Sequence, residues 1–212
     1  MPTLNASNLT LNDVQHRFNM TERLSELFSD SLTLGSITPY EQQEISQIRD
    51  DFLRYLAVGK VSEGQVKFLV LAPLLRLAGF YQTPLTIQLE ESIAEIVVED
   101  EDTVIKGRMD ILTVNTSQAP GFWVLVIEAK NSSVDVFEGL PQLLTYVFKQ
   151  LEQQSAVWGL VTNGRNYLFS HIYQGQPPTY SLLPELSLNY PDRLVELLQV
   201  LKAIAKQQGV AA

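Results

Sequence analysis

The first long stretch of periodic hydrophobic positions begins at Thr38, after a segment rich in Ser, Thr and Asn. Thr38-Pro39-Tyr40-Glu41 is a capping box with proline at the first helical position, which predicts a helix through about Ala57. Its hydrophobic face consists of Ile45, Ile48, Phe52 and Leu56. Residues 1–37 have a weak amphipathic patch around Leu24, so we expect a loosely packed arm with one helix there.

A second helix is predicted from Ser62 to Gly79. Ser62-Glu63-Gly64-Gln65 is another capping pattern, and glycine is a common residue just past a helix end. Pro73 lies inside this span and should kink the helix, because proline has no amide hydrogen to donate.

From Thr86 the hydrophobic period shortens towards two, which indicates strands. The first four predicted strands are Thr86–Glu91, Ala94–Glu99, Thr103–Val114 and Phe122–Glu128. The hydrophobic run Phe122–Ile127 is unbroken, which is typical of a central strand covered on both faces. A helix at 137–153, strands at 156–162 and 167–173, and a final helix at 191–206 complete an α/β domain with a mixed sheet.

Composition narrows the class of protein. The chain has 212 residues, of which 45% are hydrophobic and 18% charged, as expected for one globular domain with a good core. No hydrophobic run approaches the roughly 20 residues that span a bilayer, and the first residues lack the features of a secretory signal. We therefore expect a cytoplasmic protein with no membrane partner.

The available side-chain chemistry is restricted further by the absence of cysteine. Disulfides and cysteine-containing zinc sites are excluded, and the two distant histidines, His16 and His171, make a histidine-led metal site or a serine–histidine triad improbable. The net charge of -9 argues against a strong grip on nucleic acid, but residues 90–102 hold seven of the 24 acids and no base. The rest of the chain is nearly balanced.

The strongest candidate site follows the buried strand, where Glu128 and Lys130 lie on one face because strand residues two apart point the same way. If the predicted strand that contains Asp110 and the buried strand that ends at Glu128 pair as a hairpin, Asp110 lies near Glu128. Two carboxylates held close together repel unless one is protonated or a cation lies between them. Mg²⁺ suits such a pair, since it takes oxygen ligands and needs one or two carboxylates plus a substrate phosphate.

This pattern, Asp110 followed by Glu128-Ala129-Lys130, resembles the PD-(D/E)xK nuclease superfamily, with Met109 in place of the proline that names it. Other blocks are similar to the N-terminal nuclease domain of type I restriction enzyme motor subunits. These are the helix Ser62–Gly79, the Gln-xxx-Tyr pattern of Gln142 and Tyr146, and the Thr-Asn-Gly turn at 162–164. The resemblance covers about residues 62–173. It implies a restriction endonuclease-like mixed sheet flanked by helices, with an N-terminal helical extension and a C-terminal helix.

The resemblance also implies roles for individual residues. Asp110, Glu128, Glu63 and the Ala129 carbonyl would be metal ligands for Mg²⁺, with Mn²⁺ as a substitute, and Lys130 would position the attacking water. Gln142, Tyr146, Arg108 and Arg165 would support the substrate. The implied reaction is in-line attack of water on phosphorus without a covalent enzyme intermediate.

The expected organisation is an N-terminal arm and helix at 1–60, a nuclease-like core at 61–176 and a C-terminal loop and helix at 177–212, in one globular domain. DNA is the expected partner, with a homodimer and a separate motor or specificity protein as further expectations, since the chain has no helicase motifs of its own.

Two other interpretations remain open. The first is a catalytically inactive member of the same fold that binds nucleic acid or protein, which the net charge and the few basic residues near the site favour. The second is a metal-free enzyme or scaffold in which Glu128 and Lys130 only neutralise each other. Glu-Ala-Lys at a strand end is weak evidence alone, because a solvated salt bridge has the same sequence.

Overall fold

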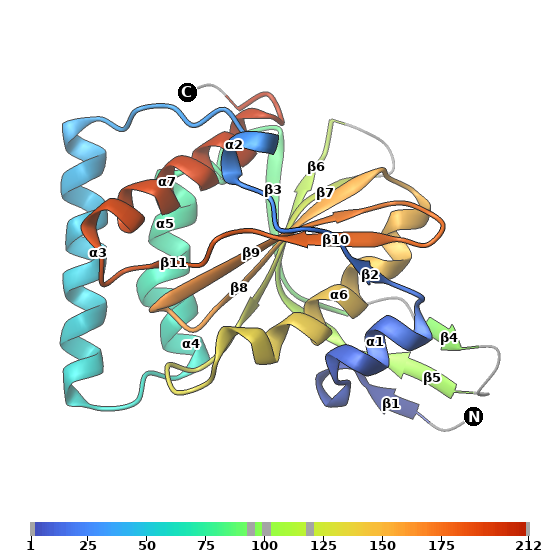
Figure 1. Ribbon diagram of the computed structural model, residues 1–212. Coiled ribbons are helices and arrows are strands. Elements are labelled where there is room, and N and C mark those ends of the chain that lie inside the picture. Colours follow the sequence, from blue (N-terminus) through green and yellow to red (C-terminus); the bar gives the residue numbers. More distant parts are fainter. Residues whose placement is uncertain (1–2, 93–95, 99–102, 118–120, 211–212) are drawn as a thin grey trace.

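The computed structural model describes residues 3–92, 96–98, 103–117 and 121–210. Its main feature is an eight-stranded mixed sheet in the order β2-β10-β9-β8-β7-β6-β3, with β11 also paired to β9 (Figure 1). The strands are β2 (Thr21–Glu22), β3 (Leu85–Ser92), β6 (Arg108–Asn115), β7 (Phe122–Ala129), β8 (Ala156–Thr162), β9 (Asn166–Tyr173), β10 (Thr179–Leu182) and β11 (Leu186–Ser187). The pairs β7–β8 and β2–β10 are parallel and the other pairs are antiparallel.

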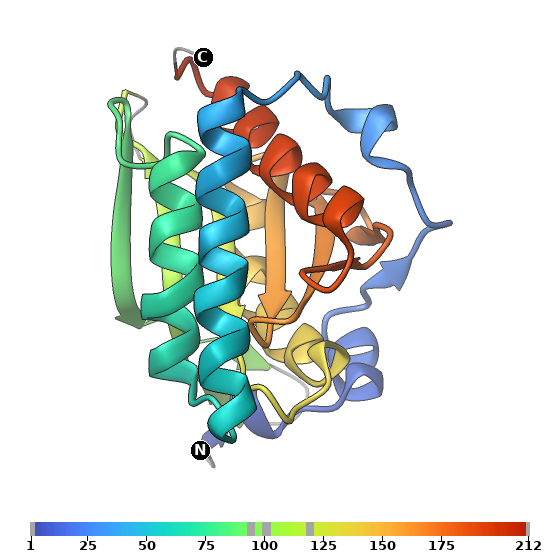
Figure 2. The same ribbon diagram turned by 90° about the vertical axis from the view of Figure 1, so that its left-hand side faces the viewer.

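Helices cover both faces of this sheet, which confirms the predicted α/β class. One face packs against α3 (Pro39–Val58), α5 (Ala72–Leu77) and α7 (Pro191–Lys206), which Figure 2 shows in front of the strands. The other face packs against α1 (Leu11–Arg17) and α6 (Leu140–Phe148). The arrangement is consistent with a restriction endonuclease-like fold. Within the described residues, no helix is both long and apolar enough to cross a membrane.

Strand β7 lies in the interior of the sheet, between β6 and β8, as its hydrophobic sequence predicted. Every residue from Val124 to Ala129 is buried. Leu125 and Ile127 pack in the core with α3, α5 and α7, whereas Val126 packs in the core with α6. Because side chains of β7 pack in the cores on both faces of the sheet, the backbone at the end of this strand is held in a fixed position.

A second, three-stranded sheet projects from the main one, in the order β1-β5-β4. It consists of β1 (Thr3–Asn5), β4 (Ile96–Val98) and β5 (Thr103–Lys106). The prediction of one strand over 103–114 was wrong, because the chain leaves the small sheet at Gly107 and enters the main sheet as β6. The predicted strand 94–99 and the acidic segment 90–102 lie partly outside the described residues.

The N-terminal arm is more ordered than the sequence suggested. Its strands β1 and β2 pair with β5 and β10, which are distant in the chain. Phe18, just after α1, stacks on Phe148 at 4.3 Å between ring centroids, and Phe28, in the short helix α2 (Phe28–Ser31), meets Phe169 edge-on. Leu24 is 92% exposed, so the amphipathic patch around it did not mark a long helix.

The predicted helix Ser62–Gly79 is present but changes its winding. It starts as α4 (Glu63–Val66), continues as the π-helical segment η2 (Lys67–Leu71) and ends as α5. Pro73 cannot donate to the carbonyl four residues earlier, and the wider winding ahead of it accommodates that missing bond. Similarly, the helix predicted at 137–153 is α6 flanked by the 3-10 segments η4 (Val136–Gly139) and η5 (Lys149–Glu152).

Candidate active site

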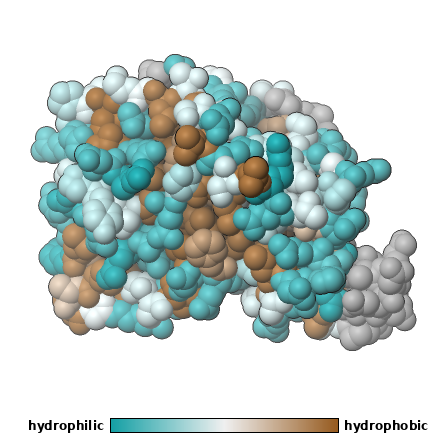
Figure 3. All heavy atoms as spheres, in the orientation of Figure 1, coloured by the Kyte–Doolittle hydropathy of each residue, from teal (hydrophilic) through white to brown (hydrophobic). Residues whose placement is uncertain are grey.

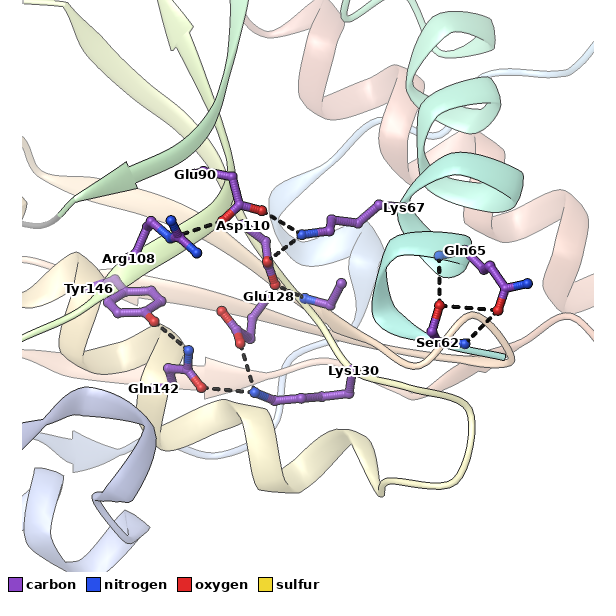
Figure 4. A network of polar contacts seen from close by, with 11 residues as sticks. Ser62, Gln65, Lys67, Glu90, Arg108, Asp110, Glu128, Lys130, Gln142 and Tyr146 are labelled. Carbon is purple, nitrogen blue, oxygen red and sulfur yellow. Dashed lines mark hydrogen bonds and ion pairs between the residues drawn. The ribbon is translucent and has the colours of Figure 1, made fainter. Parts of the chain in front are cut away.

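Strands β6 and β7 bring Asp110 and Glu128 together. The paired positions Ile111↔Ile127 and Leu112↔Val126 fix an antiparallel register in which Asp110 and Glu128 come next. Residues directly opposite each other in such a pair point to the same face of the sheet, with Cβ atoms about 5 Å apart. Figure 4 shows the two carboxyl groups side by side. The structure therefore places these two acids side by side, as the sequence predicted.

Asp110 is held at both of its oxygens. The backbone amide of Ala129 donates to Oδ2 at 2.8 Å, and the ammonium of Lys67 donates to Oδ1 at 2.8 Å. The first contact comes from the neighbouring strand and the second from the helix across the site (Figure 4). Sequence reasoning missed Lys67. The available signal was its spacing of four residues from Glu63 on the same capped helix.

Lys130 is fixed between Glu128 and a side chain from α6. Its Nζ lies 2.7 Å from Oε1 of Glu128 and 2.8 Å from Oε1 of Gln142. Gln142 in turn donates through Nε2 to the hydroxyl of Tyr146, one helical turn further along α6. Gln142 thus contacts Lys130 directly, and Tyr146 acts on Lys130 only through Gln142 (Figure 4).

Glu128 is buried, with 3% of its surface exposed. Burial and the nearby charge of Asp110 raise its pKa to about 8, and together they outweigh the contact with Lys130. Its Oε2 is buried and has no hydrogen-bond partner among the described residues. Burial and the charge of Glu128 also raise the pKa of Tyr146.

The unpartnered Oε2 of Glu128 indicates that a divalent ion fits beside this carboxylate. Glu128 Oε2 has no hydrogen-bond partner within the described part of the chain, and the neighbouring Asp110 carboxylate raises the pKa of Glu128. A bound cation would contact this oxygen and offset the repulsion between the two carboxylates. Asp110, Glu128 and water satisfy the oxygen preference of Mg²⁺. Among the described residues there is no group of three or more acidic or histidine side chains placed to hold one ion. Glu63 therefore does not join Asp110 and Glu128 in a three-carboxylate cluster.

Glu90 adds a further acidic position, beyond Asp110 and Glu128, that the sequence did not single out. Its carboxylate contacts Lys67 Nζ at 2.7 Å and Arg108 Nε at 2.9 Å. The backbone of Glu90 has a φ of 58°, a left-handed conformation that costs free energy for any residue other than glycine. The two ion pairs hold the side chain of this strained residue beside Asp110.

The site opens into a cleft of about 580 Å³. Its walls come from the arm, α4, β3, β5, β6, the end of β7 and α6. The lining residues include Asn5, Ser7, Glu63, Glu90, Lys106, Arg108, Asp110, Glu128, Lys130, Gln142 and Tyr146. The contribution of the arm was not predicted. Arg165 is not among the lining residues, because it follows the turn at Gly164, whose backbone packs against Phe52 and Val66. The prediction that Arg165 lies at the cleft was wrong.

No protein-family model matches the sequence, and no curated protein matches it. Among solved structures, the chain is similar to the fragment structure of a putative HsdR subunit of a type I restriction enzyme from Vibrio vulnificus YJ016, with 21% sequence identity and a TM-score of 0.41. That match covers 66% of this chain and 25% of the other, so the chain spans about a quarter of the length of the structure it matches.

Proposed function

We propose that this protein is a Mg²⁺-dependent endonuclease that hydrolyses phosphodiester bonds in DNA, of a restriction, defence or repair type. One observation carries the proposal. Asp110 and Glu128 face each other in an open cleft, one Glu128 oxygen is buried without a partner, and Lys130 is fixed beside them. The order of the sequence blocks that resemble type I restriction nuclease domains supports the same function.

The residues of the site would have different roles in this reaction. Asp110 and Glu128 would hold the ion, which supplies positive charge at the phosphate and lowers the pKa of water. The Ala129 amide keeps the Asp110 carboxylate in place through its 2.8 Å contact. Lys130, oriented by Glu128 and Gln142, would offset the negative charge that develops on the phosphorus oxygens.

Substrate contacts belong to the rim of the cleft. Lys106 and Arg108 line it and would contact phosphates on either side of the cleaved bond, while Glu63 adds negative charge near Glu128. Because few basic residues line the cleft, binding of DNA would gain from a second subunit or from a separate motor or specificity protein. We include a homodimer and such a partner in the proposal.

A cleavage assay tests the proposal. Purified protein should cut plasmid or oligonucleotide DNA with Mg²⁺ or Mn²⁺ and not with EDTA. Asp110→Ala and Lys130→Ala should abolish cutting. Lys149→Ala is the matched control, because Lys149 pairs with Glu152 on the surface outside the cleft and its loss should leave cutting unchanged. Equal activity in all four proteins would refute the assignment.

A second candidate is a catalytically inactive protein of the same fold that binds nucleic acid or another protein. The observation that favours it is that Asp110, Glu128 and Glu90 each already contact a basic side chain. This candidate predicts binding without metal-dependent cleavage of any DNA, with Asp110 and Lys130 intact. The same assay, combined with a binding measurement in EDTA, separates the two.

A further inference from the structure

Lys67 occupies the position of a cation between two carboxylates. Its Nζ lies 2.8 Å from Asp110 Oδ1 and 2.7 Å from Glu90 Oε1. The other Asp110 oxygen accepts the Ala129 amide. Both oxygens of the carboxylate that is best placed to hold an ion are therefore engaged by groups of the chain itself.

The position of Lys67 is built into the fold. Ser62 and Gln65 cap the start of α4, and Lys67 begins the π-helical segment that lies just before Pro73. On the other side, the strained backbone of Glu90 directs its carboxylate to the same ammonium. The pairing thus depends on two features, a widened helix and a left-handed residue, that each cost free energy and that both bring charged groups to one point.

A divalent ion at Asp110 and the ammonium of Lys67 exclude each other. They need the same Oδ1, and two cations a few ångströms apart in a partly buried place repel strongly. The side chains of Lys67 and Asp110 are 24% and 14% exposed, so solvent screens this repulsion only in part. Lys67 can release Asp110 and still keep its contact with Glu90.

We propose that Lys67 competes with the divalent ion for Asp110, so that the free protein binds the ion weakly until a phosphate of the substrate draws the ammonium away. This inference rests on the proposed nuclease function. It assigns Lys67 as a positioning residue that couples ion binding to phosphate binding at the same site. The ligand class is a phosphodiester, which offers Lys67 an anionic oxygen in exchange for Asp110.

The experiment compares two matched variants. Lys67→Met and Arg108→Met each remove one positive charge that contacts Glu90, but only Lys67 contacts Asp110. Titration calorimetry with Mn²⁺ should show tighter binding by about tenfold or more in Lys67→Met than in the natural protein, and a change of less than about threefold in Arg108→Met. Asp110→Asn placed on the Lys67→Met background should remove the gain.

A nuclease-resistant phosphorothioate oligonucleotide tests the coupling. It should tighten Mn²⁺ binding in the natural protein by about tenfold and have a much smaller effect in Lys67→Met, in which no ammonium is left to move. Lys67→Gln serves in the same role if thermal melting shows that Lys67→Met is unfolded.

The outcomes are distinguishable. If Mn²⁺ binds in an Asp110-dependent way but Lys67→Met and Arg108→Met bind it equally, or if the oligonucleotide helps both forms equally, the competition is refuted and the nuclease proposal stands. If no folded variant binds Mn²⁺ in an Asp110-dependent way, the proposed function fails and this inference fails with it.

Discussion

Glu128 is a buried carboxyl group whose pKa is raised to about 8 by burial and by Asp110. Between the ordinary value of 4.5 and about 8, the folded protein holds this proton more tightly than the unfolded chain does. The stabilisation of the folded protein by this bound proton is complete below pH 4.5 and is lost as the pH rises through about 8.

This predicts that the metal-free protein melts at a lower temperature as the pH rises from 6 to 8.5. Glu128→Gln, which carries no titrating proton at this position, should remove at least about 3 °C of that fall. Thermal melting in EDTA measures both proteins. Equal slopes with pH in the two would mean that Glu128 titrates normally.

Gly139 allows the end of β7 and the start of α6 to approach each other closely. A Cβ atom there would lie 2.5 Å from Val161 Cγ1, 3.1 Å from Lys130 Cε and 3.4 Å from Glu128 Cγ. Two of these three neighbours are side chains of the candidate site. A glycine at this position is therefore required by space, since its backbone φ of -87° is open to any residue.

Gly139→Ala should displace Lys130 and Glu128 without changing any charge. We expect a loss of about 1–3 kcal/mol in the free energy of unfolding, and a fall in cleavage of about a hundredfold. Gly35→Ala is the control, because a Cβ there meets nothing within 4 Å. Urea unfolding and the plasmid assay give the two readouts, and full activity in Gly139→Ala would show that the site tolerates the shift.

At the scale of elements, Glu26 fastens the arm to the edge of the main sheet. It accepts hydrogen bonds from Tyr173 at 2.9 Å, from Ser181 at 2.9 Å and from Ser31 at 3.2 Å. Burial opposes its charge, but these hydroxyl donors outweigh burial and lower its pKa. The arm thus depends on one carboxylate as well as on the short pairing of β2 with β10.

Glu26→Ala should leave the fully buried hydroxyl of Ser181 without an acceptor and loosen residues 21–32. We expect a loss of about 1–3 kcal/mol in stability and faster cutting in this segment by a protease. Glu152→Ala, which removes an exposed acid on η5, should change stability by less than about 0.5 kcal/mol. A normal digestion pattern for Glu26→Ala would show that the strand pairing alone holds the arm.

Sequence patterns predicted those elements whose residues specify them locally. Capping boxes placed the starts of α3 and α4, and the hydrophobic run of β7 placed it inside the sheet. The ordering of the arm escaped prediction because its partners, β5 and β10, are far away in the chain, and two- or three-residue strands have no periodicity of their own. The break at Gly107 escaped for a related reason, since β5 and β6 carry one continuous strand-like sequence.

At the scale of the whole molecule, the charge of the cleft bears on the proposed binding of DNA. The cleft carries three basic side chains, Lys106, Arg108 and Lys130, and four acidic ones, Glu63, Glu90, Asp110 and Glu128. The face drawn in Figure 3 mixes hydrophilic and hydrophobic residues and shows no broad uniform area of either kind. If DNA binds in this cleft, as proposed, its electrostatic attraction to the lining should be weak.

The affinity for duplex DNA should fall only slowly with salt. Each neutralised phosphate contributes about -0.9 to the slope of log affinity against log salt, so the three basic residues of the cleft, with Lys67 as a fourth, give a slope no steeper than about -4. Fluorescence anisotropy in EDTA, over a series of salt concentrations, measures it. A slope near -6 would instead place much of the DNA on a surface outside this cleft.

The candidate site was predictable where residues share a strand or face each other across a hairpin. Asp110, Glu128 and Lys130 follow from the period of two and from the pairing of β6 with β7. Glu90, Asn5 and Ser7 line the cleft because of a left-handed residue and a distant arm, which sequence spacing does not encode. Lys67 contacts Asp110 from a widened helix, and its spacing from Glu63 was the one signal for it. The role of Arg165 was implied by the resemblance of the Thr-Asn-Gly turn, but Arg165 is not among the residues that line the cleft.

The pairing of the arm also sets an order of events during synthesis. Strand β2 has no partner until β10 has been made, because Thr21 pairs with Thr179, and β1 waits for Val104. Such distant contacts form late and slowly. A nascent chain still on the ribosome would thus have the carboxylates of β6 and β7 in register before the arm has docked at both ends. The wall of the cleft that carries Asn5 can pair as soon as Lys106 has been made, whereas the other end of the arm stays unpaired until synthesis has passed Tyr180.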